Sequence, residues 1–102
     1  MSIYVIMPFC SFDSDKWKTP NDERIVGFYT DKNKAFNAVI NNNADIHETV
    51  YDYCLIELIE EGLYNSIGKK GRWLFRYNKE TGQYEPESEP EEWKGLSGFT
   101  IG

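Results

Sequence analysis

The sequence predicts an α+β fold: a mostly antiparallel sheet of about five strands, with one main helix packed on one face. Three observations support this prediction. Several short segments rich in β-branched and aromatic residues are separated by turn residues, which is typical of strands. One segment, at about residues 31–43, carries the apolar stripe of a helix. The chain of 102 residues is 40% hydrophobic and 16% aromatic, which suits one folded domain spanning residues 1–102.

The first two strands are expected at residues 3–7 and 24–29. Residues 3–7 are apolar at alternating and intervening positions alike, so both faces of this strand are expected to be buried, and Pro8 is expected near its end. Between the two strands, Cys10 to Glu23 is polar and rich in turn residues, and it is predicted to be a long loop. Trp17 lies in this loop. It is expected to pin the loop to the core, and the alternative is an exposed side chain that contacts a partner.

The helix is expected to start at Thr30 or Asp31, because either side chain can accept a hydrogen bond from a free N–H of the first turn. Apolar residues then recur on one side of a 3.6-residue period, and three asparagines (residues 41–43) can end the helix.

Residues 50–59 are ambiguous, since a helical stripe can be started there but breaks at Glu57. Strand alternation fits better, and it places this segment centrally in the sheet because both faces are apolar. Glu57 is the one charged residue within it. We expect it to form a cross-strand ion pair with Arg72 or Arg76 or to lie exposed, and the functional alternative is a ligand or acid–base group in a cleft.

The C-terminal part predicts a hairpin followed by a short turn and a last strand. Residues 72–77 and 83–86 are expected to pair around a loop that contains Gly82. A helical turn is expected at residues 90–93, with Pro90 in its first position. Residues 99–101 predict an edge strand, through which the chain could form a homodimer.

The charge excludes some classes of partner. The chain has 17 acidic and 11 basic residues, a net charge of −6. Residues 80–92 include six glutamates and no basic residue. Such a surface repels the phosphates of nucleic acids and anionic membranes, so neither is expected as a direct partner. The simplest interpretation of the acidic run at residues 80–92 is that it keeps the protein soluble. The functional interpretation is that a basic protein surface docks on Glu87, Glu89, Glu91 and Glu92.

No catalytic, metal or cofactor site is expected. His47 is the only histidine, it precedes the central strand in a polar loop, and it is expected to be a plain surface residue. Cys10 and Cys54 are far apart in sequence and are expected to be two buried thiols. Without a recognisable signal peptide, the prediction is a cytoplasmic protein.

Three segments carry a resemblance to small bacterial and phage-associated proteins of unknown function. These segments are residues 25–35, residues 51–64 with Glu57 and Gly62, and the stretch from Trp73 to Pro90 with the final Gly-Phe-Thr-Ile-Gly. The resemblance implies an α+β sheet protein and carries no activity.

The leading hypothesis is therefore a non-enzymatic acidic accessory protein that binds another protein. The alternative is a small-molecule-binding protein or enzyme whose pocket lies near Glu57, between the sheet and the Cys10–Glu23 loop, with Tyr53 and Arg76 as further lining residues.

Overall fold

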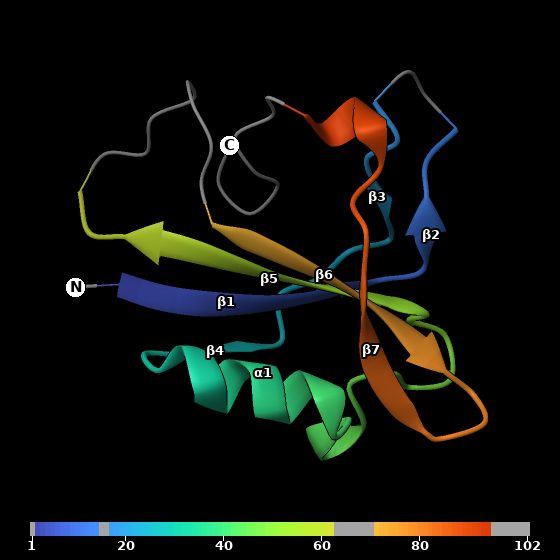
Figure 1. The fold of residues 1–102 in the computed structure, drawn as a ribbon, viewed down its shortest axis with the longest axis horizontal. Helices are drawn as coiled ribbons and strands as arrows, with labels where there is room; N and C mark the ends of the chain where they lie inside the picture. Colours follow the sequence, from blue (N-terminus) through green and yellow to red (C-terminus); the bar gives the residue numbers. More distant parts are fainter. Residues whose placement is uncertain (1, 15–16, 63–70, 95–102) are drawn as a thin grey trace.

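The computed structural model describes residues 2–14, 17–62 and 71–94. Its main element is an antiparallel sheet in the order β4-β1-β5-β6-β7, with α1 packed on one face, so the predicted α+β fold is confirmed (Figure 1). The sheet strands are β1 (Ser2–Phe9), β4 (Gly27–Tyr29), β5 (Tyr53–Glu60), β6 (Arg72–Asn78) and β7 (Gln83–Glu87). The predicted strand at residues 99–101 lies outside the described residues.

The ambiguous segment at residues 50–59 forms a strand. β5 pairs with β1 on one side and β6 on the other, which gives it the predicted central position. Its alternating side chains therefore enter two separate apolar layers, as the two apolar faces of the sequence indicated.

The first layer lies between the sheet and α1 (Lys32–Ile40). Asp31 caps this helix, because its Oδ1 accepts hydrogen bonds from the backbone N–H of Asn33 at 2.8 Å and of Lys34 at 3.3 Å. The helix is shorter than predicted and is followed by a 3₁₀ turn, η1 (Asn43–Asp45). The apolar stripe of the helix packs with one side of the sheet, through Ile6, Ala35, Ala38, Val39, Ile46, Cys54, Ile56, Phe75 and Tyr84.

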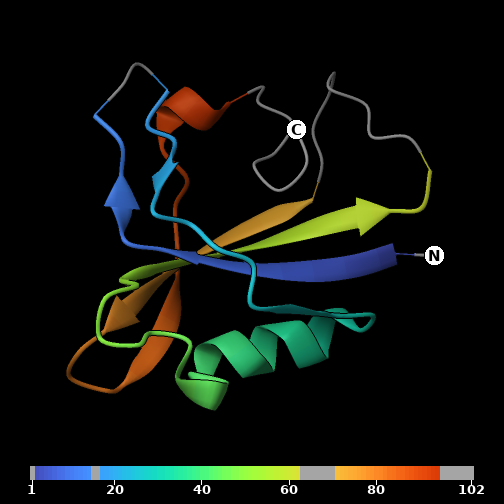
Figure 2. The ribbon, with the colours of Figure 1, turned by 180° about the vertical axis from the view of Figure 1, so that it is seen from behind.

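The second layer lies on the opposite face of the sheet, where Figure 1 shows two short strands and a 3₁₀ turn on the side away from α1. These are β2 (Ser11–Phe12), β3 (Pro20–Asn21) and η2 (Glu91–Trp93). The core there is Met7, Phe9, Leu55, Leu74 and Trp93, with Phe12 and Tyr53 packed against it. Figure 2 shows the same separation from behind, with α1 below the sheet and the two short strands above it.

The prediction that Cys10 to Glu23 is simply a loop was wrong. β2 and β3 pair within it, and the N–H of Asp13 donates to the Thr19 carbonyl at 2.7 Å. The Trp17 side chain is 46% exposed, which favours the alternative of an exposed side chain over a pin to the core. Trp93 anchors the segment instead, because it is fully buried and its Nε1–H donates to the Lys18 carbonyl at 2.8 Å. Pro90 precedes η2 as its N-cap rather than forming its first position.

Strand β4 ends the described sheet, and its pairing with β1 is irregular. Gly27 lies opposite Ile6, whereas the N–H of Arg24 donates to the Pro8 carbonyl at 3.1 Å. The pairing therefore shifts by one residue between these two points, as it does at a β-bulge. The strand predicted at residues 24–29 is therefore regular only over Gly27–Tyr29, and residues 24–26 follow β1 through the two hydrogen bonds that the Arg24 and Val26 N–H groups donate to it.

Candidate functional site

The Glu57 side chain is buried, with 2% of its surface exposed. It lies directly across from Arg72 on β6 and from Val5 on β1. Arg72 was one of its two expected neighbours, whereas Arg76 faces Tyr53. Glu57 lines neither of the two cavities described below, one of which holds Tyr53 and Arg76.

Arg72 connects several elements on this face of the sheet. Its side chain is 5% exposed, its Nε donates to Glu89 Oε1 at 2.7 Å, and its Nη2 donates to the Trp93 carbonyl at 2.6 Å. Its guanidinium also lies over the Trp93 ring, 5.6 Å from the ring centroid. This arrangement ties η2 to the sheet, which is a structural use of the charge.

The acidic run at residues 80–92 is paired within the chain at each of its four candidate residues. Glu89 pairs with Arg72, and three longer pairs join Glu87 to Arg76 at 3.8 Å, Glu91 to Lys94 at 3.4 Å and Glu92 to Lys18 at 3.7 Å. The structure thus does not present these carboxylates as one uncompensated acidic patch, although the three longer pairs are exposed enough to be weak.

His47 is not the surface residue that was expected. It is 7% exposed, and its ring stacks on the Tyr77 ring with the centroids 3.6 Å apart and the planes at 9°. Its Nε2 lies 3.0 Å from Asp52 Oδ1, and its backbone N–H donates to Asn42 Oδ1 at 2.9 Å. The residue therefore fastens the segment after α1 to the β6–β7 hairpin.

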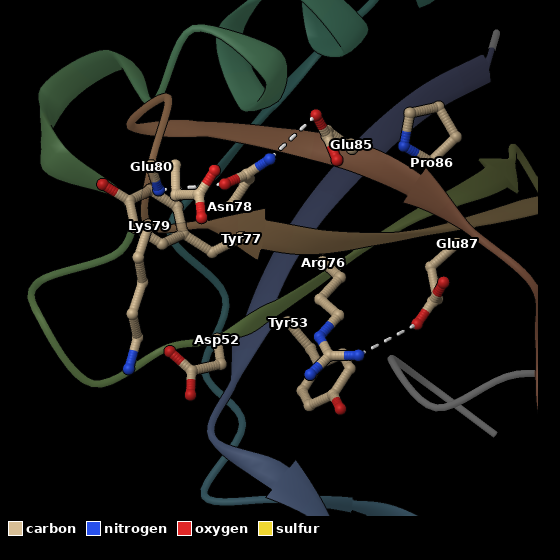
Figure 3. Close-up of a pocket in the computed structure, with 10 residues that line it drawn as sticks. All are labelled: Asp52, Tyr53, Arg76, Tyr77, Asn78, Lys79, Glu80, Glu85, Pro86 and Glu87. Carbon is tan, nitrogen blue, oxygen red and sulfur yellow. Dashed lines mark hydrogen bonds and ion pairs between the residues drawn. The ribbon is translucent and has the colours of Figure 1, made fainter.

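A polar groove of about 580 Å³ lies over the β6–β7 hairpin (Figure 3). Its lining residues are Asp52, Tyr53, Arg76, Tyr77, Asn78, Lys79, Glu80, Glu85, Pro86 and Glu87. Several of its polar side chains pair with one another. Figure 3 shows the Arg76–Glu87 ion pair and the hydrogen bond that Asn78 Nδ2 donates to Glu85 Oε2 at 3.2 Å. Tyr53 and Arg76 both line this groove, and the guanidinium carbon of Arg76 lies 5.8 Å from the centroid of the Tyr53 ring.

A second cavity, of about 310 Å³, lies between β4 and the segment after α1. Apolar residues line it together with two carboxylates and one cation, and the full set is Ile6, Arg24, Val26, Gly27, Phe28, Tyr29, Ala38, Asn43, Ala44, Asp45, Ile46 and Glu48. Arg24 pairs with Glu48 at 3.4 Å, so one formal negative charge is left at the rim.

The segment beside this cavity, which is β4 with the residues just before it, exposes large apolar side chains. The exposed fractions are 56% for Ile25, 36% for Val26, 58% for Phe28 and 37% for Tyr29. We call these four residues the β4 patch. Single exposed apolar side chains are normal on protein surfaces, but four within five consecutive residues at a sheet edge are an unusual concentration of apolar surface.

The opposite wall of the cavity has an unusual backbone. Five non-glycine residues of the segment that forms this wall have positive φ angles, between 47° and 62°: Ala44, Asp45 and Glu48, which line the cavity, and Asn42 and Thr49, which do not. This conformation is costly for ordinary side chains, most of all for a β-branched threonine. The stacking of His47 on Tyr77 and its hydrogen bonds with Asn42 and Asp52 tie this segment to the β6–β7 hairpin.

The thiols offer no activated nucleophile. Burial raises the pKa of Cys54 far above its ordinary value, and burial together with the nearby Asp22 and Asp52 carboxylates raises the pKa of Cys10. Both shifts favour the neutral thiol over the reactive thiolate. Cys54 is fully buried as predicted, whereas Cys10 is partly exposed, and both are free.

Within residues 2–14, 17–62 and 71–94, no group of three or more histidine, cysteine or carboxylate side chains is placed to hold a metal ion. In the same described part of the chain, no helix has the length and apolar character needed to cross a membrane.

Comparison of the chain with protein families, with curated proteins and with solved structures found no match. The resemblance to small bacterial and phage-associated proteins therefore stays a prediction.

Proposed function

We propose that this chain is a non-enzymatic accessory protein that binds another protein, and that the β4 patch is its binding surface. The observation that carries this proposal is the exposure of Ile25, Val26, Phe28 and Tyr29 beside a formed cavity. Leaving these side chains in water forfeits the free energy that their burial would provide, about 25 cal/mol per Å² of apolar surface. A partner that covers the patch recovers this free energy.

The size of the surface favours a protein over a small molecule. The cavity of about 310 Å³ is at the lower limit of ordinary ligand pockets. Ile25 does not line that cavity although it belongs to the β4 patch. A ligand confined to the cavity would leave Ile25 uncovered, whereas a protein segment can cover the whole patch.

The charge of the rim favours a basic partner, as the acidity of the whole chain does. Asp45 and Glu48 lie at the cavity, and within the part of the chain that the structure describes only Glu48 of the two forms an ion pair, with Arg24. A lysine or arginine of the partner beside Asp45 would complete the pairing and steer the encounter. The acidic character thus supports the same partner class as before, but at the β4 patch rather than at residues 80–92.

The experiment is capture of partners from a lysate of the source cells, with the full chain immobilised in three forms. Phe28→Asp places a charge in the β4 patch, and Glu91→Lys reverses a charge that is 86% exposed at η2. Both side chains are exposed, so both variants should keep the wild-type unfolding midpoint, which is measured alongside.

The proposal expects one stoichiometric partner that Phe28→Asp loses and Glu91→Lys retains. Loss with Glu91→Lys and retention with Phe28→Asp would move the binding surface to the acidic run and overturn the proposal. Recovery of no stoichiometric protein would also overturn it.

A further inference from the structure

We propose that the partner binds by adding an extended basic segment to the outer edge of β4 as an additional strand. In this arrangement an apolar side chain of the segment enters the cavity of about 310 Å³, and a lysine or arginine reaches Asp45. The inference rests on the function proposed above and specifies the partner chemistry and the binding mode at the same surface.

The backbone of residues 24–29 supports strand addition. The N–H groups of Arg24 and Val26 both point toward β1, where they donate to the Pro8 and Ile6 carbonyls at 3.1 and 3.0 Å. Backbone groups of a strand alternate in direction, so the N–H of Ile25 points to the outer side. No described strand pairs with that outer side, since β4 ends the sheet. An incoming strand therefore finds hydrogen-bonding groups already arranged.

The side chains of the patch lie on both faces of that edge. Tyr29 is opposite Tyr4, which packs with the layer under α1, whereas Phe28 is opposite Val5 on the other face. A strand added alongside would place its own alternating side chains next to both of them. Strand addition thus covers the whole patch, which docking of a helix against only one face of the strand would not do.

The absence of a protecting charge in β4 is informative. Exposed edge strands are usually protected from pairing with other chains by an inward-pointing charge, a lysine, a proline, a bulge or a very short length. Residues 25–29, Ile-Val-Gly-Phe-Tyr, contain no charge, lysine or proline, so only the bulge and the three-residue length of β4 protect this edge. The bulge beside Gly27 shortens the regular edge without placing a charge on it.

Electrostatics favours a basic foreign segment over a second copy of this chain. Each copy carries a net charge of −6, and pairing two β4 edges would bring two rims with Asp45 and Glu48 toward each other. Like charges placed across an interface reduce affinity, whereas a basic segment would be attracted.

The test uses a short capped peptide of alternating valine and lysine, titrated against the full chain and followed by peptide fluorescence anisotropy. Two matched peptides accompany it. One carries N-methyl groups on alternate residues, which removes hydrogen-bond donors from one edge and keeps every side chain. The other has glutamate in place of lysine.

The protein variants are Ile25→Pro, which removes the outward N–H, and Ile25→Val, which keeps that N–H and a similar side chain. Proline is tolerated on an edge strand when its N–H faced solvent, so the Val26 amide should stay protected from hydrogen exchange in Ile25→Pro. We expect the lysine peptide to bind wild type and Ile25→Val. Affinity should fall about tenfold or more with Ile25→Pro, with the N-methylated peptide and with the glutamate peptide.

Binding that is equally tight with the N-methylated peptide, or no binding of the lysine peptide at about 1 mM, would overturn strand addition. A dimer of the chain by light scattering that Ile25→Pro dissociates would assign the edge to a second copy and overturn the basic partner. The two proposals fail separately. A captured partner that is lost with Phe28→Asp but kept with Ile25→Pro refutes strand addition alone, and one kept with both variants refutes the proposed function.

Discussion

Arg72 and Arg76 lie on the same strand, each paired with a glutamate near the end of the chain, yet their removal should have very different consequences. The side chain of Arg72 is 5% exposed and that of Arg76 is 62% exposed. We predict that Arg72→Met destabilises the protein by about 3–5 kcal/mol, because it removes two charge-assisted hydrogen bonds from a buried guanidinium whose partner Glu89 is 30% exposed. Arg76→Met should cost no more than about 1 kcal/mol, as exposed ion pairs do.

The larger value follows from the groups that Arg72 leaves behind. Glu89 loses a 2.7 Å hydrogen bond and the Trp93 carbonyl loses one of 2.6 Å, each with a charged donor and worth about 1.5–3 kcal/mol. Glu57 remains buried opposite the substituted residue. Methionine preserves most of the volume, so the loss measures the charge and its hydrogen bonds more than a cavity.

The assay is urea unfolding at neutral pH, followed by the fluorescence of the three tryptophans. The slope of free energy against urea should stay constant, so that a shift in midpoint reports stability. A second variant, Arg72→Met with Glu57→Leu, removes the buried carboxylate and should recover part of the loss. Equal midpoints for Arg72→Met and Arg76→Met would refute the reasoning, because burial would then have no effect on the value of the charge.

Two further predictions concern the β2–β3 pair, which Trp93 anchors, and the buried Cys54 thiol and Tyr84 hydroxyl. Trp93→Phe removes the donor to the Lys18 carbonyl, so the free energy of unfolding should fall by about 1 kcal/mol or more. Hydrogen exchange of the Asp13 amide should become faster, whereas that of the Asn41 amide, at the C-terminal end of α1, should not change. Equal acceleration of both amides would contradict the assignment of this anchor. Burial raises the pKa values of Cys54 and Tyr84, so the folded state keeps protons that the unfolded state releases. The contribution of these two groups to the free energy of unfolding should therefore be level below about pH 8.5 and fall above it. Urea midpoints measured against pH in reducing buffer follow this decline in stability. Cys54→Ala should remove most of the decline between about pH 8.5 and 10 and leave the decline above about pH 10, which comes from Tyr84. An unchanged pH profile in that variant would count against Cys54 as the source.

The sheet and the helix could be predicted because their signals are local. The two apolar faces of residues 50–59 required a central strand, and β5 occupies that position. The helix start at Asp31 needs only one side chain within reach of the first turn. His47 carried no such signal, since its burial depends on stacking with Tyr77, thirty residues away in the sequence. The pairing of the acidic run was hidden for the same reason, because Glu92 and Glu89 meet cations from residues 18 and 72.

The β4 patch shows how a visible pattern can lack meaning until the topology is known. Ile-Val-Gly-Phe-Tyr at residues 25–29 predicts a strand whether that strand is central or at an edge. In a central strand these side chains would be core, and their lack of charge would need no explanation. β4 has β1 on one side only, so the same residues become exposed and the same lack of charge becomes a property of the surface. The acidic run is the opposite case: it is conspicuous in the sequence, but in the structure its candidate residues pair with cations of the same chain. These cations are Lys18, Arg72, Arg76 and Lys94. The position of a residue in the sheet, more than its type, therefore decides whether its side chain is core or surface.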